Sequence, residues 1–363
     1  MIEDRIPEFA ICDTCVELTK ELGRETPGLE NLHSVCNGIL RSLIRKKEEL
    51  TFPSEEEDQT LALSIRYSVP AWLVEKLVAD YGPDEARALM ACRQQEAIVI
   101  RPNLTKLDDT GLEKLLADKV WQHEPGLVPH AVRVTGMADM AHDNGFTHGD
   151  YSIESESSML ACMALDPKRG QTVLDCCAAP GGKTCYIAEL MGGTGRVYSW
   201  DLHPHRVDLI EAQVKRLHLE NVRPVIRDAS VVREELIDTL DAVLLDAPCS
   251  GTGDMADKPD VKYRPTAESV EQLVHTQQAL LDAMALYVKR GGVLVYSTCS
   301  VLKDENERQI EAFLQRHPDF VIDRLPESIP ERFRRHYGTG LQLLPQRDGV
   351  GGFYICRLKR KRV

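Results

Sequence analysis

The spacing of hydrophobic positions changes along the chain. In residues 1–67, apolar side chains recur every three or four positions, which predicts helices. One helix is expected from Glu8 to Leu22, with Gly23 as its stop. Residues 68–150 mix helical stretches with short strands and turns. From residue 151 to 363 the pattern changes again, so we predict a short all-helical N-terminal region, a small α/β subdomain and a larger domain.

In the larger domain, short apolar runs alternate with helical stretches. The expected strands are Thr172–Asp175, Arg196–Trp200, Arg223–Ile226, Ala242–Asp246, Val293–Ser297, Phe320–Arg324 and Gly352–Leu358. The expected helices cover residues 182–191, 204–217, 267–289 and 304–316. This alternation predicts an α/β, Rossmann-like domain with a doubly wound, mostly parallel sheet. The last strands follow each other closely, so one of them is expected to be antiparallel.

Composition restricts where the protein works. No apolar run approaches the roughly 20 residues of a membrane helix, and the acidic start Met1–Arg5 does not resemble a signal peptide. Eleven cysteines, an odd number, suit a reducing compartment better than a disulfide framework. Cys12 and Cys15 form a C-x-x-C pair without a second pair, so both are interpreted as helix residues. We therefore predict a cytoplasmic protein with no membrane segment and no metal site.

The charge of the chain is only weak evidence about a nucleic-acid partner. The formal net charge of −13 disfavours a nucleic-acid partner, but most of the acidic excess lies in residues 1–150. Basic groups remain in the tail Lys359–Arg362 and around Arg41–Lys47. Because charge interactions are screened within about 10 Å at ordinary salt, such local patches can still hold phosphates.

A small-residue turn follows the first strand of the larger domain. It consists of Cys177, Ala178, Ala179, Pro180, Gly181, Gly182 and Lys183. A phosphate-binding P-loop would need glycine at Cys177, and the dinucleotide pattern G-x-G-x-x-G is absent. S-adenosylmethionine has no phosphates, so a shorter glycine turn at a helix start is enough to bind it.

Three acidic residues stand at or just after successive strand ends. Asp201 follows the turn by about 20 residues, where a carboxylate can bind both ribose hydroxyls. Asp228 is placed to accept from the adenine amino group, and Asp246 faces the reacting end. One such Asp can simply cap a helix. The three together predict an S-adenosylmethionine site.

Two cysteines stand in polar turns after buried strands, in Asp246-Ala247-Pro248-Cys249-Ser250 and in Ser297-Thr298-Cys299-Ser300. Carbon 5 of a pyrimidine is a poor nucleophile until a thiolate adds to carbon 6. Because a free thiol is only a few per cent ionised at neutral pH, a cation such as Lys183 or the cofactor sulfonium is expected nearby. Either cysteine alone would be interpreted as an inert core thiol, but the pair predicts covalent chemistry.

These motifs resemble those of the RsmB/Nop/Sun family of RNA 5-methylcytosine methyltransferases, over nearly all of residues 68–363. The segment Lys258–Tyr263, Asn306 and the segment Gly349–Tyr354 agree with that family. The resemblance implies the following roles: Cys299 as nucleophile, Cys249 in release of the methylated RNA, Asp246 at the target cytosine, and Cys177 to Lys183 with Asp201, Arg206 and Asp228 around S-adenosylmethionine.

Within the family the chain is similar to the bacterial RsmB type, which implies small-subunit (16S) ribosomal RNA as substrate. Residues 1–67 resemble the second half of a NusB-like domain, so their apolar faces are expected to be exposed or to meet a partner. The chain departs from the family at Asp254–Asp257, where relatives often carry two arginines, and at Glu154, where they often carry Gln. We expect a monomer that takes single-stranded or loop RNA.

The subdomain at 68–150 is expected to help grip the RNA, with Arg93, Arg101 and Lys106 as candidate contacts. Three other functions stay open from the residues: a 5-methylcytosine methyltransferase of tRNA or another RNA, an amino-group methyltransferase, and a non-catalytic RNA-binding factor in ribosome assembly. An amino-group enzyme usually places an aromatic residue after a strand-end proline, where this chain has Cys249. Cys299 would also have no role in that enzyme, and the presence of both thiols and all three acidic residues argues against a non-catalytic binding factor.

Overall fold

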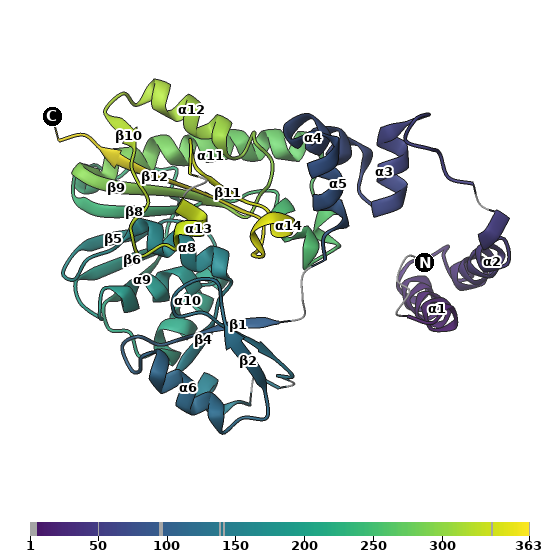
Figure 1. Cartoon of the computed structure of the whole chain (residues 1–363), viewed down its shortest axis with the longest axis horizontal. Coiled ribbons are helices and arrows are strands. Elements are labelled where there is room, and N and C mark those ends of the chain that lie inside the picture. The colour runs from purple at the N-terminus through teal and green to yellow at the C-terminus, as the bar shows by residue number, and fades with distance from the viewer. Residues whose placement is uncertain are drawn as a thin grey trace. The chain divides into compact units, whose positions relative to one another are not determined.

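The structure is a computed structural model that describes residues 6–49, 51–93, 97–137, 139–140, 142–334 and 337–362. It divides into two compact units, Met1–Ile65 and Arg66–Val363 (Figure 1), and each unit is described by itself. The interpretation of Met1–Arg5 lies outside the described residues. No helix within the described ranges has the length and apolar character needed to cross a bilayer.

The first unit is helical, as expected. Its elements are α1 (Glu8–Glu25), α2 (Leu32–Arg45), the short turn η1 (Lys47–Glu49) and most of α3 (Gln59–Tyr67). The expected stop at Gly23 is wrong, because α1 continues to Glu25. A Cβ at Gly23 would lie 2.6 Å from the carbonyl oxygen of Leu29, so the glycine lets the returning chain approach. Apolar faces in this region were expected to be exposed or to meet a partner. Large apolar side chains such as Phe9 and Val35 are indeed exposed.

The next two helices are α4 (Ala71–Tyr81) and α5 (Pro83–Ala91). The Tyr81 hydroxyl donates to the carbonyl of Val301, and Asp80 pairs with Arg308 at 2.9 Å. These contacts place the pair beside the larger domain. Residues 68–150, expected as one subdomain, thus include a helix pair that contacts the larger domain.

A four-stranded antiparallel sheet follows, in the order β2-β3-β1-β4. Its elements are β1 (Ile98–Pro102), α6 (Asp109–Ala117), β2 (Gln122–Pro125), β3 (Val132–Thr135), α7 (Asn144–Thr147) and β4 (Tyr151–Ile153). Ile100, Leu112 and Val134 are fully buried in its core. Because β4 completes this sheet, the subdomain extends to Ile153 instead of ending at residue 150.

Arg101 of β1 is fully buried, which overturns its expected role in gripping RNA. Its guanidinium bonds Glu154 at 2.7 Å and Glu189 at 2.6 Å, and it stacks over the ring of Tyr186 at 4.2 Å. A buried guanidinium needs such partners to offset its lost hydration. Arg101 therefore joins the small sheet to the larger domain.

The larger domain contains a mixed eight-stranded sheet with the order β10-β12-β9-β8-β5-β6-β7, and β11 pairs with β12. The strands are β5 (Thr172–Asp175), β6 (Arg196–Asp201), β7 (Val222–Ile226), β8 (Leu240–Asp246), β9 (Val288–Thr298), β10 (Phe320–Ile322), β11 (Leu341–Leu343) and β12 (Phe353–Arg360). Strands β5 to β9 pair in parallel, whereas β12 is antiparallel to β9, β10 and β11. The expected mostly parallel sheet with a reversed late strand is confirmed.

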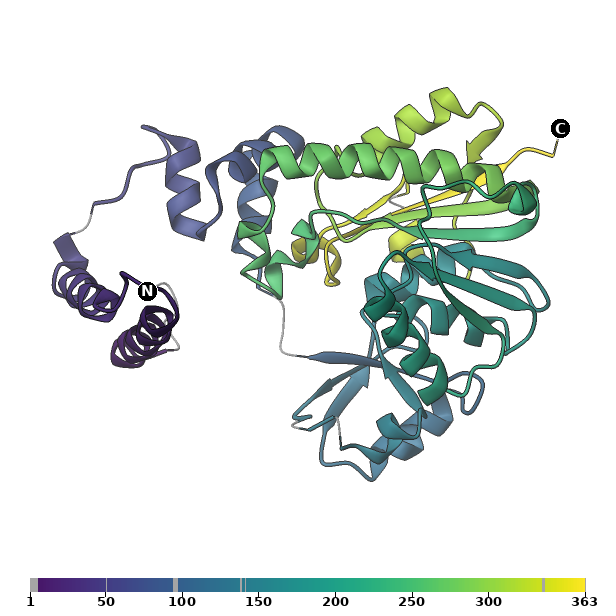
Figure 2. The same ribbon diagram turned by 180° about the vertical axis from the view of Figure 1, so that it is seen from behind.

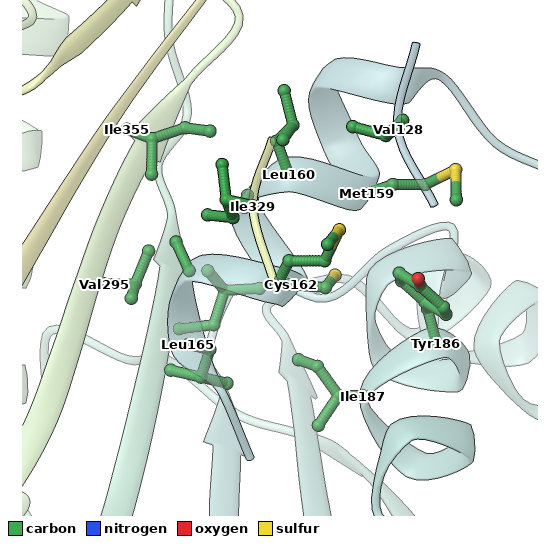
Figure 3. Close-up of a cluster of buried hydrophobic side chains, with 14 of the residues drawn as sticks. Val128, Met159, Leu160, Cys162, Leu165, Tyr186, Ile187, Val295, Ile329 and Ile355 are labelled. Atoms are coloured by element: carbon green, nitrogen blue, oxygen red, sulfur yellow. The ribbon is translucent and has the colours of Figure 1, made fainter. Parts of the chain in front are cut away.

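Helices cover both faces of this sheet. They are α8 (Glu156–Leu165), α9 (Gly182–Leu190), α10 (Pro204–Arg216), α11 (Ala267–Tyr287), α12 (Glu307–Arg316), α13 (Glu331–Arg334) and α14 (Pro345–Asp348), with short turns η2 (Glu234–Leu236), η3 (Thr252–Ala256) and η4 (Val261–Tyr263). Figure 2 shows α11 lying along one face, with α8 and α9 on the opposite side. On that side Leu160 and Cys162 pack with Val295 of β9 and Ile355 of β12 (Figure 3). This rigid core fixes the strand ends that carry the site.

Candidate active site

The predicted cofactor turn lies at the carboxyl end of β5, directly before α9. Gly181 has φ +108, and a Cβ there would lie 3.1 Å from the Cα of Ile210. A larger residue would be strained by both the backbone angle and the close contact. The turn is fixed by backbone hydrogen bonds, because the Ala178 amide donates to the carbonyl of Trp200 at 2.8 Å. The backbone therefore fixes part of this turn.

A pocket of about 180 Å³ opens beside this turn. Of the residues predicted to bind the cofactor, those that line it are Cys177, Ala178, Ala179, Pro180, Gly182, Lys183 and Asp246. Glu154 and Asp175 line it as well. The structure thus brings most of the predicted turn and the fourth strand end to one cavity.

Asp201 and Arg206 support the turn from β6 and α10. Asp201 is almost fully buried and accepts from the amides of Ala179 at 3.3 Å and His203 at 3.2 Å. The Arg206 Nε lies 3.4 Å from the Asp201 carboxylate. Asp201 is therefore held next to the turn, where it was predicted, although neither it nor Arg206 is among the pocket-lining residues.

Asp228 is placed differently. It is exposed in the loop after β7, and its carboxylate accepts from the Ser230 amide at 2.8 Å and the Ser230 hydroxyl at 2.6 Å. These hydrogen bonds lower the pKa of Asp228. Its carboxylate already stabilises a local turn and does not line the pocket.

Asp246 connects the cofactor turn with the reacting end. Its Oδ2 lies 2.8 Å from the Lys183 Nζ, and its Oδ1 accepts from the Ser297 hydroxyl at 2.7 Å. Burial opposes a charge on Lys183, but the Asp246 carboxylate outweighs it, so the pKa of Lys183 is raised. Lys183 thus stays protonated and fixes the orientation of Asp246.

Two carboxylates in the pocket were not predicted as site residues. Oε1 of Glu154 and Oδ1 of Asp175 are buried and have no hydrogen-bond partner within the described part of the chain. Burial raises the pKa of Asp175 to about 7. The sequence offered weak signals for both, because Asp175 ends the first strand and Glu154 departs from the family pattern. Unpartnered acceptors at one pocket suit a cationic ligand group, and S-adenosylmethionine carries an ammonium and a sulfonium.

The two predicted thiols meet at the ends of neighbouring parallel strands. Asp246 of β8 is in register with Ser297 of β9, so the turns that follow lie side by side. The Sγ atoms of Cys249 and Cys299 are 3.3 Å apart, and both cysteines are free. The hydrogen bond with Cys299, burial and the nearby charges of Cys299 and Glu305 raise the pKa of Cys249 well above its usual range. Cys249 therefore retains its proton.

Asn306, one of the residues that agree with the family, forms hydrogen bonds that hold the turn around Cys299. The Asn306 side chain accepts from the Thr298 hydroxyl at 2.5 Å and donates to the carbonyl of Ser300 at 2.9 Å. The Gly253 amide donates to the carbonyl of Cys299 at 2.9 Å. A Cβ on Gly253 would lie 1.9 Å from the carbonyl oxygen of Gly352, so no other residue fits there.

The pocket and the thiol pair form one site. Lys183 of the cofactor turn contacts Asp246, which bonds Ser297, two residues before Cys299. Cys249 follows Asp246 by three residues. Lys183 and Asp246, which line the pocket, thus connect it to the two thiol-bearing turns. Among the described residues, no group of three or more His, Cys, Asp or Glu side chains is arranged to hold a metal ion.

Comparison with known proteins gives the same assignment. Residues 162–359 match the family model described as 16S rRNA methyltransferase RsmB/F. The chain is 38% identical to the probable ribosomal RNA small subunit methyltransferase B of Bacillus subtilis, over 99% of this chain and 79% of that protein. It is 30% identical to the ribosomal RNA small subunit methyltransferase B of Pasteurella multocida, over 99% of this chain and 78% of that protein.

A solved structure shares the architecture. The crystal structure of a methyltransferase homolog protein from Pyrococcus horikoshii aligns with a TM-score of 0.72 and 26% identity, over 84% of this chain and 99% of that chain. The family match covers the cofactor turn, both thiol motifs and the strands that carry them. The chain belongs to the RsmB/F family of 16S rRNA methyltransferases.

Proposed function

We propose that Cys299 is the nucleophile with which this chain methylates carbon 5 of a cytosine in small-subunit ribosomal RNA. Family membership gives the reaction class, an S-adenosylmethionine-dependent rRNA (cytosine-C5) methyltransferase. The observation that carries the residue roles is the 3.3 Å contact between Cys249 and Cys299 beside the Asp246 carboxylate. The same reaction class accounts for both thiols, whereas an amino-group methyltransferase would need neither.

The covalent step begins at Cys299. Its thiolate sulfur bonds to carbon 6 of the cytosine, and the electrons of the 5,6 double bond make carbon 5 nucleophilic. When bound, S-adenosylmethionine supplies the electrophilic methyl group to that carbon. A base then takes the proton from carbon 5, the electron pair of that C–H bond restores the 5,6 double bond, and the Cys299 sulfur leaves carbon 6 as a thiolate. Cys249, whose sulfur touches that of Cys299, assists this release.

Asp246 orients and polarises the target base. Its carboxylate is fixed by Lys183 on one oxygen and by Ser297 on the other. A carboxylate held in this way accepts a hydrogen bond from the cytosine edge without having to reorganise during the reaction. Lys183 acts by holding Asp246 in place and by keeping positive charge near the thiol pair.

The cofactor is held by the turn from Cys177 to Lys183 and by three further groups. Asp201 is placed to accept from the ribose hydroxyls, and Arg206 supports it. The unpartnered oxygens of Glu154 and Asp175 accept from the α-ammonium group of the cofactor. Asp228, at the third strand end, contributes a weaker contact to the adenine.

The substrate segment is single-stranded or looped RNA. A stacked cytosine cannot bring carbon 6 within bonding distance of a thiol, so the base must leave any helix. Arg93 and Lys106 remain candidate RNA contacts, whereas Arg101 does not.

The test is methyl transfer with the substrates compared directly. The full chain is incubated with methyl-labelled S-adenosylmethionine and unmodified 16S rRNA or, separately, unmodified tRNA. We expect label on 16S rRNA, located at one cytosine by bisulfite sequencing. Label only on tRNA would contradict the substrate, label on an exocyclic amine would contradict the chemistry, and no label would support a binding factor.

A further inference from the structure

Glu305 is a buried carboxylate between the two thiol-bearing turns. It is fully buried and lies just before α12. Its oxygens accept four hydrogen bonds, from the Ser250 amide at 2.9 Å, the Ser250 hydroxyl at 2.5 Å, the Ser300 hydroxyl at 2.5 Å and the Gln277 side-chain amide at 3.0 Å. All four donors are neutral, so these bonds bring no countercharge.

The four hydrogen bonds are what allow the Glu305 carboxylate to be buried. Removing an ionised group from water is strongly opposed unless a cation or several hydrogen bonds offset the loss. A glutamine would fill the same space without a charge to desolvate. A glutamine, however, has one carbonyl oxygen in place of two carboxylate oxygens, so it could not accept all four bonds, and the carboxylate is the better group for joining both turns.

The hydrogen bonds of Glu305 join the two turns directly. Ser250 follows Cys249, and Ser300 follows Cys299, so one carboxylate holds both neighbours of the reactive residues. The hydroxyls of Ser250 and Ser300 also lie 3.2 Å apart. This arrangement sets the relative position of the two sulfur atoms, because a shift of either turn would break a bond to Glu305.

The charge of Glu305 also distinguishes the two sulfurs. The titratable groups that interact electrostatically with Cys249 are Cys299, Glu305 and the buried Tyr296, and Lys258 interacts with Cys299. A fixed negative charge beside Cys249 opposes a second one on its sulfur. Cys249 is therefore the residue that keeps its proton at the 3.3 Å contact.

We propose that Glu305 is a positioning residue that aligns the two thiol turns and keeps the proton on Cys249. This inference rests on the proposed roles of Cys249 and Cys299. In this proposal the buried Glu305 carboxylate determines that Cys299, and not Cys249, attacks the base. The Cys249 thiol then donates a hydrogen bond to the Cys299 thiolate until the bond to carbon 6 forms.

The experiment compares Glu305→Gln with Glu189→Gln in the full chain. Glu189 is an equally buried carboxylate that bonds Arg101 and does not line the pocket, so its variant controls for the loss of any buried charge. Alkylation of Cys249 and Cys299 by iodoacetamide is followed with pH, without RNA, and each site is quantified by peptide mass spectrometry. Methyl transfer to 16S rRNA gives kcat and the KM for S-adenosylmethionine.

In the wild-type chain and in Glu189→Gln, we expect Cys299 to be alkylated well before Cys249. In Glu305→Gln, alkylation of Cys249 should rise on the order of tenfold, because one pKa step changes the thiolate fraction by that factor. Its kcat should fall on the order of 100-fold through misplacement of the sulfurs, while the KM for S-adenosylmethionine stays within about twofold. The proposal would be overturned if Glu305→Gln kept the thiol reactivity and the kcat of the wild-type chain. It would also be overturned if Glu189→Gln showed the same faster alkylation of Cys249 and the same fall in kcat.

A second variant covers the case in which Glu305→Gln does not fold. Ser300→Ala removes one donor and keeps the charge, so kcat should fall while Cys249 stays slow to alkylate. An unchanged kcat in Ser300→Ala would contradict the positioning role. Because alkylation is measured without RNA, failure of this inference is distinguishable from failure of the wild-type chain to methylate 16S rRNA.

Discussion

The cofactor pocket and the thiol pair lie at the same sheet edge but are built in different ways. The cofactor turn is shaped by its backbone, through the positive φ of Gly181 and the amide of Ala178. The thiol pair is held by side chains, through Asp246, Asn306 and the bonds to Glu305. A single side-chain change should therefore disturb the thiol pair strongly and the pocket weakly.

The largest effect is expected from Cys299→Ala. Without the sulfur that adds to carbon 6, methyl transfer should fall by roughly 10⁴-fold or more. Affinity for S-adenosylhomocysteine, measured by calorimetry, should stay within about twofold because the pocket does not contain Cys299. A loss of cofactor affinity as large as the loss of methyl transfer would show that the cofactor pocket and the thiol pair do not act separately.

Asp246→Asn should affect both halves, because Asp246 lines the pocket and adjoins the thiol pair. We expect kcat to fall on the order of 10² to 10³-fold, as for the loss of one preorganised polar group. Cofactor affinity should fall less, since Lys183 keeps its place in the turn. Steady-state kinetics with 16S rRNA measures kcat and the KM for S-adenosylmethionine. Ser297→Ala is the matched control, because it removes the hydrogen bond to Oδ1 of Asp246 and keeps the carboxylate.

A moderate effect is expected from pH. The pKa of Asp175 is raised to about 7 in the folded chain from an ordinary value of 3.8, so its carboxyl binds a proton between these values. Its neutral form stabilises the fold at low pH, and this contribution is lost as the pH rises through 7. Asp246, Lys183 and Glu154 are the charged groups around it.

A cationic ligand favours the ionised form, so affinity for S-adenosylhomocysteine should rise about tenfold from pH 6 to pH 8. Asp175→Asn should remove most of this dependence, and Glu154→Gln should weaken binding at both pH values. Binding of 5′-methylthioadenosine, which lacks the ammonium group, should show neither effect. A pH dependence that persists in Asp175→Asn would contradict the assignment.

The smallest effect is expected from Asp228→Ala. Its exposed carboxylate already bonds Ser230, so only a solvent-screened contact to the adenine is lost. Affinity for S-adenosylhomocysteine should fall by about threefold, the equivalent of one weak hydrogen bond. A loss as large as that of Asp201→Ala, measured in the same titration, would show that Asp228 lies closer to the cofactor than its turn suggests.

The sequence predicted those features that depend on local pattern. Strand ends, the glycine turn and the placement of both thiols after strand ends follow from apolar runs and turn residues. It did not predict that Arg101 is buried, because a guanidinium near the end of a short strand gives no sign of two carboxylates 53 and 88 residues away. Glu305 was missed for the same reason, since its partners come from three separate segments. The stop at Gly23 was wrong because a close chain approach also selects glycine.

The central claim is that Cys299 bonds the RNA and Cys249 releases it, and the most direct measurement is covalent trapping. Cys249→Ala is incubated with S-adenosylmethionine and labelled 16S rRNA fragments, and the products are separated on a denaturing gel. We predict a protein–RNA adduct that survives denaturation and disappears in the Cys249→Ala, Cys299→Ala double variant. Normal turnover without an adduct, or an adduct that persists without Cys299, would contradict the account.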